Sequence, residues 1–363
     1  MTHAQYVRNA WYMAGWDRDF GSGPAGCRIL GEPIVIFRNE QNSAFALADM
    51  CPHRLAPLSL GRCEQGRLRC LYHGLLFETD GACAEVPGQV QPPQNLRVRS
   101  YPLIERYNAI WIWMGEPAAA DATLIPDFVG YADPRWSMVP GKMDYAAPAK
   151  LINDNLLDLS HVGWVHRDRF AGGNPNAAKG WVYGQTKTEK LDRGVRVTRR
   201  LPNVPPTPSF GAAAMSKPGP GDVYSWYEFL VPGVFLQFVG RYPVGTLERA
   251  GEGAPLDEPL VSNFSCQAVT PIDDSHARYF FAFGPDSRFP EETQHFTHLA
   301  ELAFLEDKRI IEGQYARMTE VPSARIRPLI MDQTVLIYEG LLKSLSAAET
   351  EARMMSDSIV KSD

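Results

Sequence analysis

Residues 51–73 begin with Cys51-Pro52-His53 and, after sixteen further residues, end with Cys70-Leu71-Tyr72-His73. Each end of this stretch can present one thiolate and one imidazole from a tight loop. A 2Fe-2S cluster needs four ligands, two for each iron, and two His can replace two Cys on one of the irons. Imidazole ligands raise the reduction potential above that of a four-Cys cluster. The stretch therefore predicts a 2Fe-2S site held by Cys51, His53, Cys70 and His73.

Two other interpretations compete: a structural zinc site with two Cys and two His, and two unrelated Cys-His pairs. Each half of the stretch mixes Cys with His, which differs from the ligand spacing of a C2H2 finger. The pattern C-x-H…C-x-x-H resembles the Rieske motif. Respiratory Rieske proteins are a poorer match. They carry an extra disulfide pair in the cluster loops, and this sequence has Leu55 and Leu71 near those positions. Cys63 and Cys83 are expected to be small buried or loop thiols rather than ligands.

Short apolar runs surround the Cys-His stretch. Ile34–Phe37, Phe45–Ala48 and Ala109–Met114 are typical of buried strands, and Asp80-Gly81 is a hairpin-turn signal. We therefore expect an all-β domain over residues 1–118, with the predicted cluster at its loops.

Length, charge and apolar runs limit the class of protein. The chain has 363 residues, which favours two domains. Its net charge of −6 argues against nucleic acid as a partner. It shows no secretory signal pattern and no run of about 18 uncharged apolar residues. We therefore expect a cytoplasmic protein that does not enter a membrane.

The composition changes at Ala118–Ala122, so a second domain is predicted over residues 119–363. Apolar positions indicate a helix over 148–167, strands at 181–200, 223–240 and 261–284, and helices over 291–318 and 331–353. Residues 202–221 are rich in Pro and Gly and predict a long loop. In the helix 291–318 the apolar stripe includes Phe296, Leu299, Leu302, Ala303, Leu305, Ile310 and Ile311. This region is predicted to be α+β, with an antiparallel sheet and long helices.

A second group of polar residues lies in the predicted helix 148–167. At about 100° per residue, Asp154, Asp158 and His161 would share one helix face. His166 follows five residues after His161 and would point roughly 140° away on an ideal helix. A bend near Gly163 would let both imidazoles reach one metal. Two His need a carboxylate to complete the facial triad of a mononuclear non-haem Fe(II) site; the alternative is a helix with satisfied core histidines.

The pattern D-x3-D-x2-H-x4-H resembles the catalytic signature of Rieske non-haem iron oxygenases, and the resemblance extends over nearly the whole chain. Asn9-Ala10-Trp11-Tyr12 and Cys51-Pro52-His53-Arg54 also look like the oxygenase components of vanillate O-demethylase and dicamba monooxygenase. The resemblance implies a curved sheet gripping a long helix, and a third iron ligand on a late helix. Asp307 matches that place, with Glu306 and Glu312 as alternatives.

The same resemblance implies an electron route. Asp158 matches an acid that links the iron site of one subunit to a cluster-ligating His, here His73, of the next subunit in a head-to-tail homotrimer. A carboxylate at this place would orient the imidazole. Asp154 is a further candidate, to orient the helix or a ligand. The electrons would come from a separate NAD(P)H-dependent reductase or ferredoxin, since Gly21–Gly26 neither follows a strand nor opens a helix as a dinucleotide site requires.

The implied reaction is mono-oxygenation of a small aromatic substrate with O2, with O-demethylation of an aryl methyl ether favoured. The alternatives are ring hydroxylation or dioxygenation within the same family and, from a different class, a Rieske electron carrier that would use only the first centre. Four polar residues are predicted to line the substrate pocket: Gln237, Asn263, Gln267 and His298.

Overall fold

The computed structural model describes residues 6–170, 184–207 and 219–360. Its contacts divide the chain into two compact units, which are described separately. Unit 1 contains the chain up to Asp127 together with Thr270–Asp274 and the chain from Ser346 onward, and unit 2 contains Phe128–Val269 and Ser275–Leu345. The domain boundary after residue 118 remains a prediction. Within the described residues, no helix combines the length and apolarity that crossing a membrane requires.

Unit 1 is built from three small sheets, in agreement with the predicted all-β domain. Their strand orders are β1-β11-β10, β2-β3-β4-β9 and β5-β6-β7-β8. The strands are β1 Trp11–Trp16, β2 Ala25–Ile29, β3 Glu32–Arg38, β4 Ala44–Ala48, β5 Arg62–Glu64, β6 Arg67–Arg69, β7 Leu76–Phe77, β8 Cys83–Glu85, β9 Ser100–Tyr101, β10 Leu103–Arg106 and β11 Ala109–Trp113. The three predicted apolar strands are confirmed as β3, β4 and β11.

The predicted turn at Asp80-Gly81 joins β7 to β8. Gly81 has φ +85°, and a Cβ at this position would lie 2.0 Å from the carbonyl oxygen of Val98. Only glycine meets both demands, because it tolerates positive φ and has no side chain. The short hairpin places the second Cys-His pair just before β7.

Unit 2 contains one seven-stranded sheet in the order β12-β18-β17-β16-β15-β14-β13. Its described pairings, β12 with β18 and β13 through β17 in succession, are antiparallel. The strands are β12 Val139–Tyr145, β13 Gln185–Leu191, β14 Gly194–Val204, β15 Gly221–Leu230, β16 Val234–Tyr242, β17 Val261–Pro271 and β18 Ala277–Pro285. Part of the loop predicted at 202–221 is the end of β14, and residues 208–218 lie outside the described residues.

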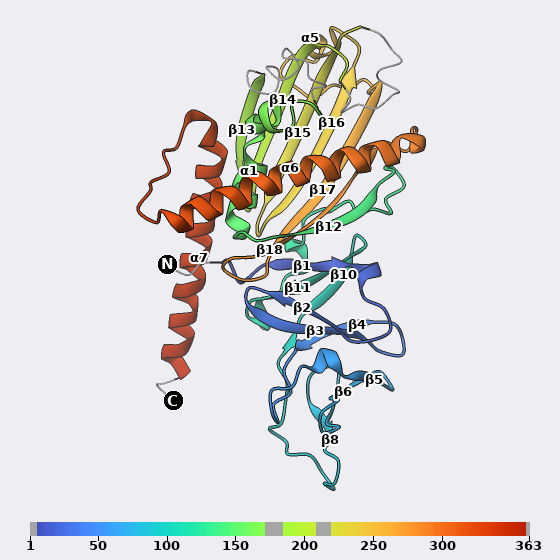
Figure 1. Ribbon diagram of the computed structural model, residues 1–363, viewed down its shortest axis with the longest axis vertical. Coiled ribbons are helices and arrows are strands. Elements are labelled where there is room, and N and C mark those ends of the chain that lie inside the picture. The colour runs from blue at the N-terminus through green and yellow to red at the C-terminus, as the bar shows by residue number, and fades with distance from the viewer. Residues whose placement is uncertain (1–5, 171–183, 208–218, 361–363) are drawn as a thin grey trace. The chain divides into compact units, whose positions relative to one another are not determined.

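The α-helices of the described chain are α1 Ala149–Leu157, α2 Val162–Val165, α5 Thr246–Arg249, α6 Thr293–Glu320 and α7 Gln333–Val360. Short 3-10 turns lie at η1 Asp17–Asp19, η2 Leu58–Leu60, η3 Pro117–Ala119, η4 Ala122–Leu124, η5 Leu159–His161, η7 Pro290–Glu292 and η8 Ile330–Asp332. Figure 1 shows the long helix α6 running across the sheet, where it contacts β12 and β18 and also α1 and α2. The α+β class and the long late helices are thereby confirmed.

The buried face of α6 differs in part from the predicted apolar stripe. Phe296, Leu299, Ala303 and Ile311 are buried as predicted. Leu305 and Ile310 are about half exposed, at 50% and 55%. The buried stripe instead contains Ala300, Phe304 and one charged residue, Asp307. A carboxylate on the buried face of a helix needs polar partners, which points to the site below.

Candidate metal centres

The two Cys-His segments of unit 1 form loops with the same backbone hydrogen bonds. Cys51 N–H donates to the carbonyl of Ala56 at 2.9 Å, and Leu55 N–H donates to the carbonyl of Cys51 at 2.8 Å. In the second loop Cys70 N–H donates to the carbonyl of Leu75 at 2.8 Å, and Gly74 N–H donates to the carbonyl of Cys70 at 3.1 Å. Leu55 and Gly74 both have positive φ, at 58° and 75°. Two matching turns therefore each begin at a cysteine.

The side chains of these loops divide into a buried pair and an exposed pair. Cys51 and Cys70 are both 2% exposed and belong to the core of this unit. His53 and His73 are exposed, with their ring centroids 4.5 Å apart. Burial raises the pKa of the Cys51 thiol to about 11, so a bound metal would be needed to hold the thiolate at neutral pH. Two thiolates and two imidazoles presented together fit a 2Fe-2S cluster with one His-bearing iron.

The other cysteines near this centre have structural surroundings. Cys63 on β5 and Cys83 on β8 are half-buried and pack against the core that includes Cys51 and Cys70. Burial raises the pKa of both thiols, as it does for Cys51, so it is their packing against this core that marks them as structural residues. This agrees with their interpretation as packing residues.

In unit 2 the segment predicted as one helix over 148–167 is broken, so that prediction is wrong. Helix α1 ends at Leu157, and Asp158 adopts an extended conformation with φ −112° and ψ 93°. The Asp158 carboxylate accepts hydrogen bonds from Ser160 N at 2.8 Å and Ser160 Oγ at 2.9 Å, which starts the turn η5. Tyr227 Oη donates to the Leu157 carbonyl at 2.7 Å and satisfies the end of α1. The change of direction occurs at Asp158, not at Gly163.

As a result, Asp154, Asp158 and His161 do not share a helix face. Asp154 accepts a hydrogen bond from Lys150 at 2.6 Å, and Lys150 also pairs with Glu339. Burial raises the pKa of Asp154 despite that partner. The Asp154 carboxylate lies outside both the metal-ligand group and the cavity described below.

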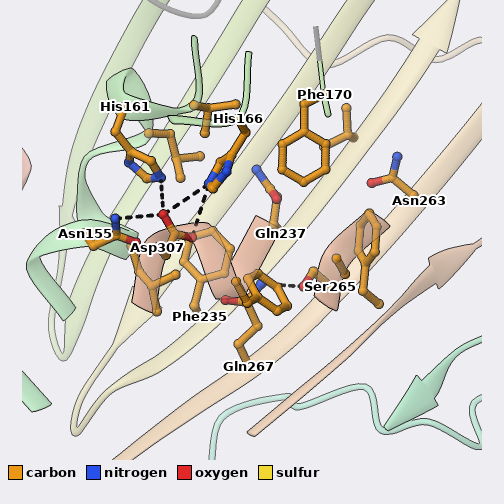
Figure 2. Close-up of a pocket in the computed structure, with 17 residues that line it drawn as sticks. Asn155, His161, His166, Phe170, Phe235, Gln237, Asn263, Ser265, Gln267 and Asp307 are labelled. Atoms are coloured by element: carbon orange, nitrogen blue, oxygen red, sulfur yellow. Dashed lines mark hydrogen bonds and ion pairs between the residues drawn. The ribbon is translucent and has the colours of Figure 1, made fainter. Parts of the chain in front are cut away.

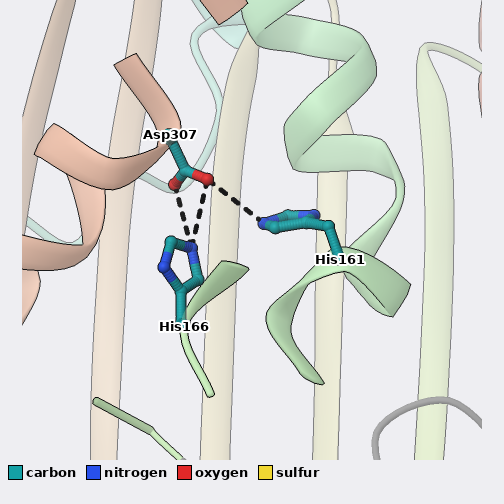
Figure 3. Close-up of side chains that lie close together, drawn as sticks. All are labelled: His161, His166 and Asp307. Atoms are coloured by element: carbon teal, nitrogen blue, oxygen red, sulfur yellow. Dashed lines mark hydrogen bonds and ion pairs between the residues drawn. The ribbon is translucent and has the colours of Figure 1, made fainter. Parts of the chain in front are cut away.

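Among the described residues, His161, His166 and Asp307 form a group whose possible ligand atoms all lie within 4.8 Å of one another. Figure 3 shows both imidazoles turned toward the Asp307 carboxylate. His161 Nε2 lies 3.5 Å from Asp307 Oδ1, and His166 Nε2 lies 3.1 Å from the same oxygen. His166 and Asp307 are 2% and 5% exposed. Two imidazoles and one carboxylate on one side of a small space fit a facial-triad iron site.

The Nδ1 atoms of the two histidines explain this orientation. His161 Nδ1 contacts the carbonyl oxygen of Asp158, and His166 Nδ1 lies 2.9 Å from Glu306 Oε2. Glu306 is in turn paired with Arg169 at 3.2 Å. An acceptor at Nδ1 keeps the proton there and leaves the Nε2 lone pair for a metal.

The electrostatics of the two imidazoles differ. Burial lowers the pKa of His161. Burial also opposes the charged form of His166, but the carboxylates of Asp307 and Glu306 outweigh it and raise the pKa of His166. Without a metal, therefore, His166 is the imidazole that holds a proton more readily.

The alternatives to Asp307 occupy other positions. Glu306 lies behind His166, at Nδ1. Glu312 accepts from Ala146 N at 2.8 Å and pairs with Lys308. Asn155, which the sequence interpretation missed, donates from Nδ2 to Asp307 Oδ1 at 3.2 Å. Its place in the polar run Asn153-Asp154-Asn155, six residues before His161, was the available signal.

The group opens onto a cavity of about 720 Å³, including its mouth. Figure 2 shows the polar side chains on the sheet beside it. Of the four residues proposed from the sequence for a substrate pocket, Gln237, Asn263 and Gln267 line this cavity. His298 does not, because it is exposed on α6. Ser265 lines it and was missed. Most of the remaining lining is apolar and aromatic: Phe170, Phe235, Phe283, Phe304, Leu156, Leu159, Val162, Val239 and Ala300.

Comparisons with known proteins agree with both centres. Residues 10–102 match the Rieske [2Fe-2S] domain, and residues 145–345 match the vanillate O-demethylase oxygenase C-terminal domain. The chain is 34% identical to a toluene-4-sulfonate monooxygenase iron-sulfur subunit of Comamonas testosteroni, over 95% of this chain and 98% of that protein. It is 32% identical to the oxygenase component of dicamba O-demethylase of Stenotrophomonas maltophilia, over 90% and 93%.

Solved structures give the same result. Dicamba monooxygenase bound to 3,6-dichlorosalicylic acid matches with a TM-score of 0.85 and 30% identity, over 96% of this chain and 99% of that one. A structure of the same enzyme with non-haem iron and dicamba matches with a TM-score of 0.77 and 28% identity, over 96% and 100%. The names of these relatives describe an iron-sulfur subunit of a monooxygenase and an oxygenase component, and one of the solved structures contains non-haem iron. The chain therefore belongs to the Rieske non-haem iron oxygenases, as an oxygenase component with a 2Fe-2S cluster and a mononuclear iron.

Proposed function

We propose that this chain mono-oxygenates a small aromatic substrate, most directly by O-demethylation of an aryl methyl ether. His161, His166 and Asp307 would hold the mononuclear iron, and Cys51, His53, Cys70 and His73 the cluster. One observation carries the proposal: a His-His-Asp group opens onto an apolar cavity with aromatic walls. An electron carrier would have no use for this second centre.

The protein residues have distinct tasks in this reaction. The apolar walls hold the ring and exclude water, which strengthens the polar contacts beside it. The Asp158 carbonyl and the Glu306 carboxylate keep both Nε2 atoms on one side. Asn155 holds one oxygen of Asp307 and limits its rotation. Bound iron would supply O2 activation at its open coordination positions.

Electrons would arrive from a separate reductase or ferredoxin through the cluster. The exposed His73 can contact another protein chain, and the Asp158 carboxylate is half-buried on the segment that carries His161. We propose that Asp158 hydrogen-bonds the partner subunit's His73 in a homotrimer. That contact would link the two centres through one carboxylate and one imidazole.

For an aryl methyl ether the proposed reaction is balanced. The substrate, O2, two electrons and two protons give the hydroxymethyl ether and water, and the hydroxymethyl ether then breaks into a phenol and formaldehyde. The toluene-4-sulfonate relative makes hydroxylation of a ring substituent without formaldehyde a second candidate, since it shows 34% identity.

A coupled assay separates the two candidates. The purified protein, a surrogate reductase and NADH would be incubated with a panel of methoxy-substituted and methyl-substituted aromatic acids, and O2 uptake and formaldehyde would be measured. Demethylation predicts equal amounts of formaldehyde and consumed substrate for at least one methoxy compound. O2 uptake with a hydroxylated product and no formaldehyde would contradict demethylation and favour the second candidate.

A further inference from the structure

On the sheet side of the cavity of unit 2, a short polar stripe lies among apolar and aromatic residues. It lies on the neighbouring strands β16 and β17, whose residues 237 and 265 are directly paired in the antiparallel register. Side chains that face each other across such a pair lie close together on one side of the sheet. Gln237 and Ser265 therefore present their polar groups side by side, with Gln267 two residues further along β17.

Ser265 and Gln267 belong to a chain of three hydrogen bonding groups. Tyr279 Oη donates to Gln267 Oε1 at 2.6 Å, and Gln267 Nε2 donates to Ser265 Oγ at 2.6 Å. All three residues are buried, at 1%, 4% and 1% exposure for Tyr279, Gln267 and Ser265. The last bond of this chain is drawn in Figure 2.

Tyr279 determines the direction in which these hydrogen bonds run. Burial raises the pKa of Tyr279 far above its usual value, so the phenol stays neutral and keeps its O–H. If the Gln267 amide were turned over, that O–H would face an amide N–H and lose its acceptor. A buried donor without an acceptor is costly, so the amide oxygen is held toward Tyr279.

The orientation of the Gln267 amide determines which hydrogen bonds the Ser265 hydroxyl can make. Its Oγ accepts from Gln267, and this is its only side-chain hydrogen bond to the described residues. A hydroxyl that accepts one bond still has one hydrogen to donate. Because Ser265 lines the cavity, that hydrogen is available to a bound molecule.

We propose that Ser265 donates a hydrogen bond to an oxygen acceptor on the substrate ring, and that Tyr279 and Gln267 fix the direction of this bond. The inference rests on the proposed function, because it takes an aromatic substrate as the occupant of the cavity. Gln237 makes no side-chain hydrogen bond to the described residues and lies beside Ser265, so its amide can contact the same substituent. Among the described residues that line the cavity there is no Lys or Arg, so we take a neutral carbonyl oxygen as the acceptor for Ser265.

Binding of matched ring compounds tests this proposal. Calorimetric dissociation constants would be measured under anaerobic conditions, which prevent turnover, for anisole and for 2-, 3- and 4-methoxybenzaldehyde. In the wild-type holoenzyme at least one aldehyde isomer should bind about 3- to 10-fold more tightly than anisole, the range expected of one hydrogen bond. Ser265→Ala should remove this difference, and Ser265→Thr, which keeps the hydroxyl, should retain it.

Tyr279→Phe provides a second test, because it leaves Ser265 in place and frees the Gln267 amide to turn. Its preference for the aldehyde should fall between those of the wild type and Ser265→Ala. An equal weakening of anisole and aldehyde in Ser265→Ala, or a wild type without any preference, would overturn the proposal. Formaldehyde release by the wild type is measured separately: its absence contradicts demethylation while the binding comparison still decides the role of Ser265.

Discussion

At the scale of single residues, the two histidines of the iron site are held by different groups. A neutral backbone carbonyl contacts Nδ1 of His161, whereas a carboxylate, Glu306, contacts Nδ1 of His166. A carboxylate at this place increases the basicity of the imidazole and strengthens its bond to a metal. Glu306 is therefore a positioning residue that acts through His166.

Replacing Glu306 tests that role. Glu306→Ala is expected to weaken iron binding at the mononuclear site by about 10- to 100-fold, the usual effect of removing such a partner. Competition with a chelator measures the affinity, and cluster absorption reports whether the other centre is intact. Glu301→Ala, on the exposed face of the same helix α6, is the matched control. Equal iron affinities in the two variants would contradict the assignment.

Sequence reasoning identified residues whose type and spacing are unusual. The Cys-His pairs and the pair His161 and His166 were visible for that reason, and family resemblance supplied Asp307. His298 does not line the cavity, because it lies nine residues before Asp307 and so about 180° around the helix. Ser265 was missed because a lone serine carries no spacing signal. Asn155 stands in a polar run, but its partner Asp307 lies 152 residues away in sequence.

At the scale of elements, the existence of helices and strands was predictable and their continuity was not. Apolar runs indicated β3, β4 and β11 correctly. The predicted helix over 148–167 is instead α1, η5 and α2. At the break, Asp158 caps η5 through Ser160, and Tyr227, 70 residues from Leu157 in sequence, donates to the Leu157 carbonyl at the end of α1. A local pattern cannot report such a tertiary bond.

A hydrogen-bonded contact joins the start of β17 to the residue that follows β18. Asp286, just after β18, accepts from Ser262 N at 3.0 Å and Ser262 Oγ at 2.9 Å, and Arg288 Nε donates to it at 2.8 Å. Burial opposes the charged form of Asp286, but Arg288 and Ser262 prevail and lower its pKa. Because the folded value is below the unfolded one, this contact stabilises the fold above about pH 4 and less as the pH falls further.

Asp286→Asn should therefore destabilise unit 2 by about 1–2 kcal/mol at pH 7, a range reduced for the half-exposed Arg288. Urea unfolding followed by tryptophan fluorescence would be measured from pH 7 to pH 3.5. The difference from the wild type should stay constant down to about pH 4.5 and then shrink. Asp257→Asn, in the exposed pair with Arg249, should change little. A difference for Asp286→Asn that grows at low pH would show the sign to be wrong.

At the scale of the whole molecule, each unit carries one candidate centre. The sequence predicted this order along the chain from composition and motifs. It did not predict that Thr270–Asp274 and the chain from Ser346 onward belong to unit 1, because these contacts join residues far apart in sequence. Subunit arrangement likewise came from family resemblance, and no pattern within one chain encodes it.

Mixed oligomers test whether the cluster of one subunit serves the iron of another. Cys70→Ala removes a cluster ligand and His161→Ala removes an iron ligand, so each variant alone should be inactive. The two chains would be co-expressed with different tags and purified through both. A head-to-tail arrangement predicts that the mixture recovers reductase-dependent O2 uptake. Mixed oligomers without activity would instead favour electron transfer within one chain.

This chain is expected to hold two separate iron centres, the cluster at Cys51, His53, Cys70 and His73 and the mononuclear iron at His161, His166 and Asp307. Iron and acid-labile sulfide per chain test it most directly, in the wild type and in Asp307→Ala. We expect two cluster irons and two sulfides plus one mononuclear iron in the wild type. Asp307→Ala should lose the mononuclear iron alone, with unchanged cluster absorption. A variant that keeps all its iron, or loses the cluster together with the mononuclear iron, would contradict two separate iron centres at these residues.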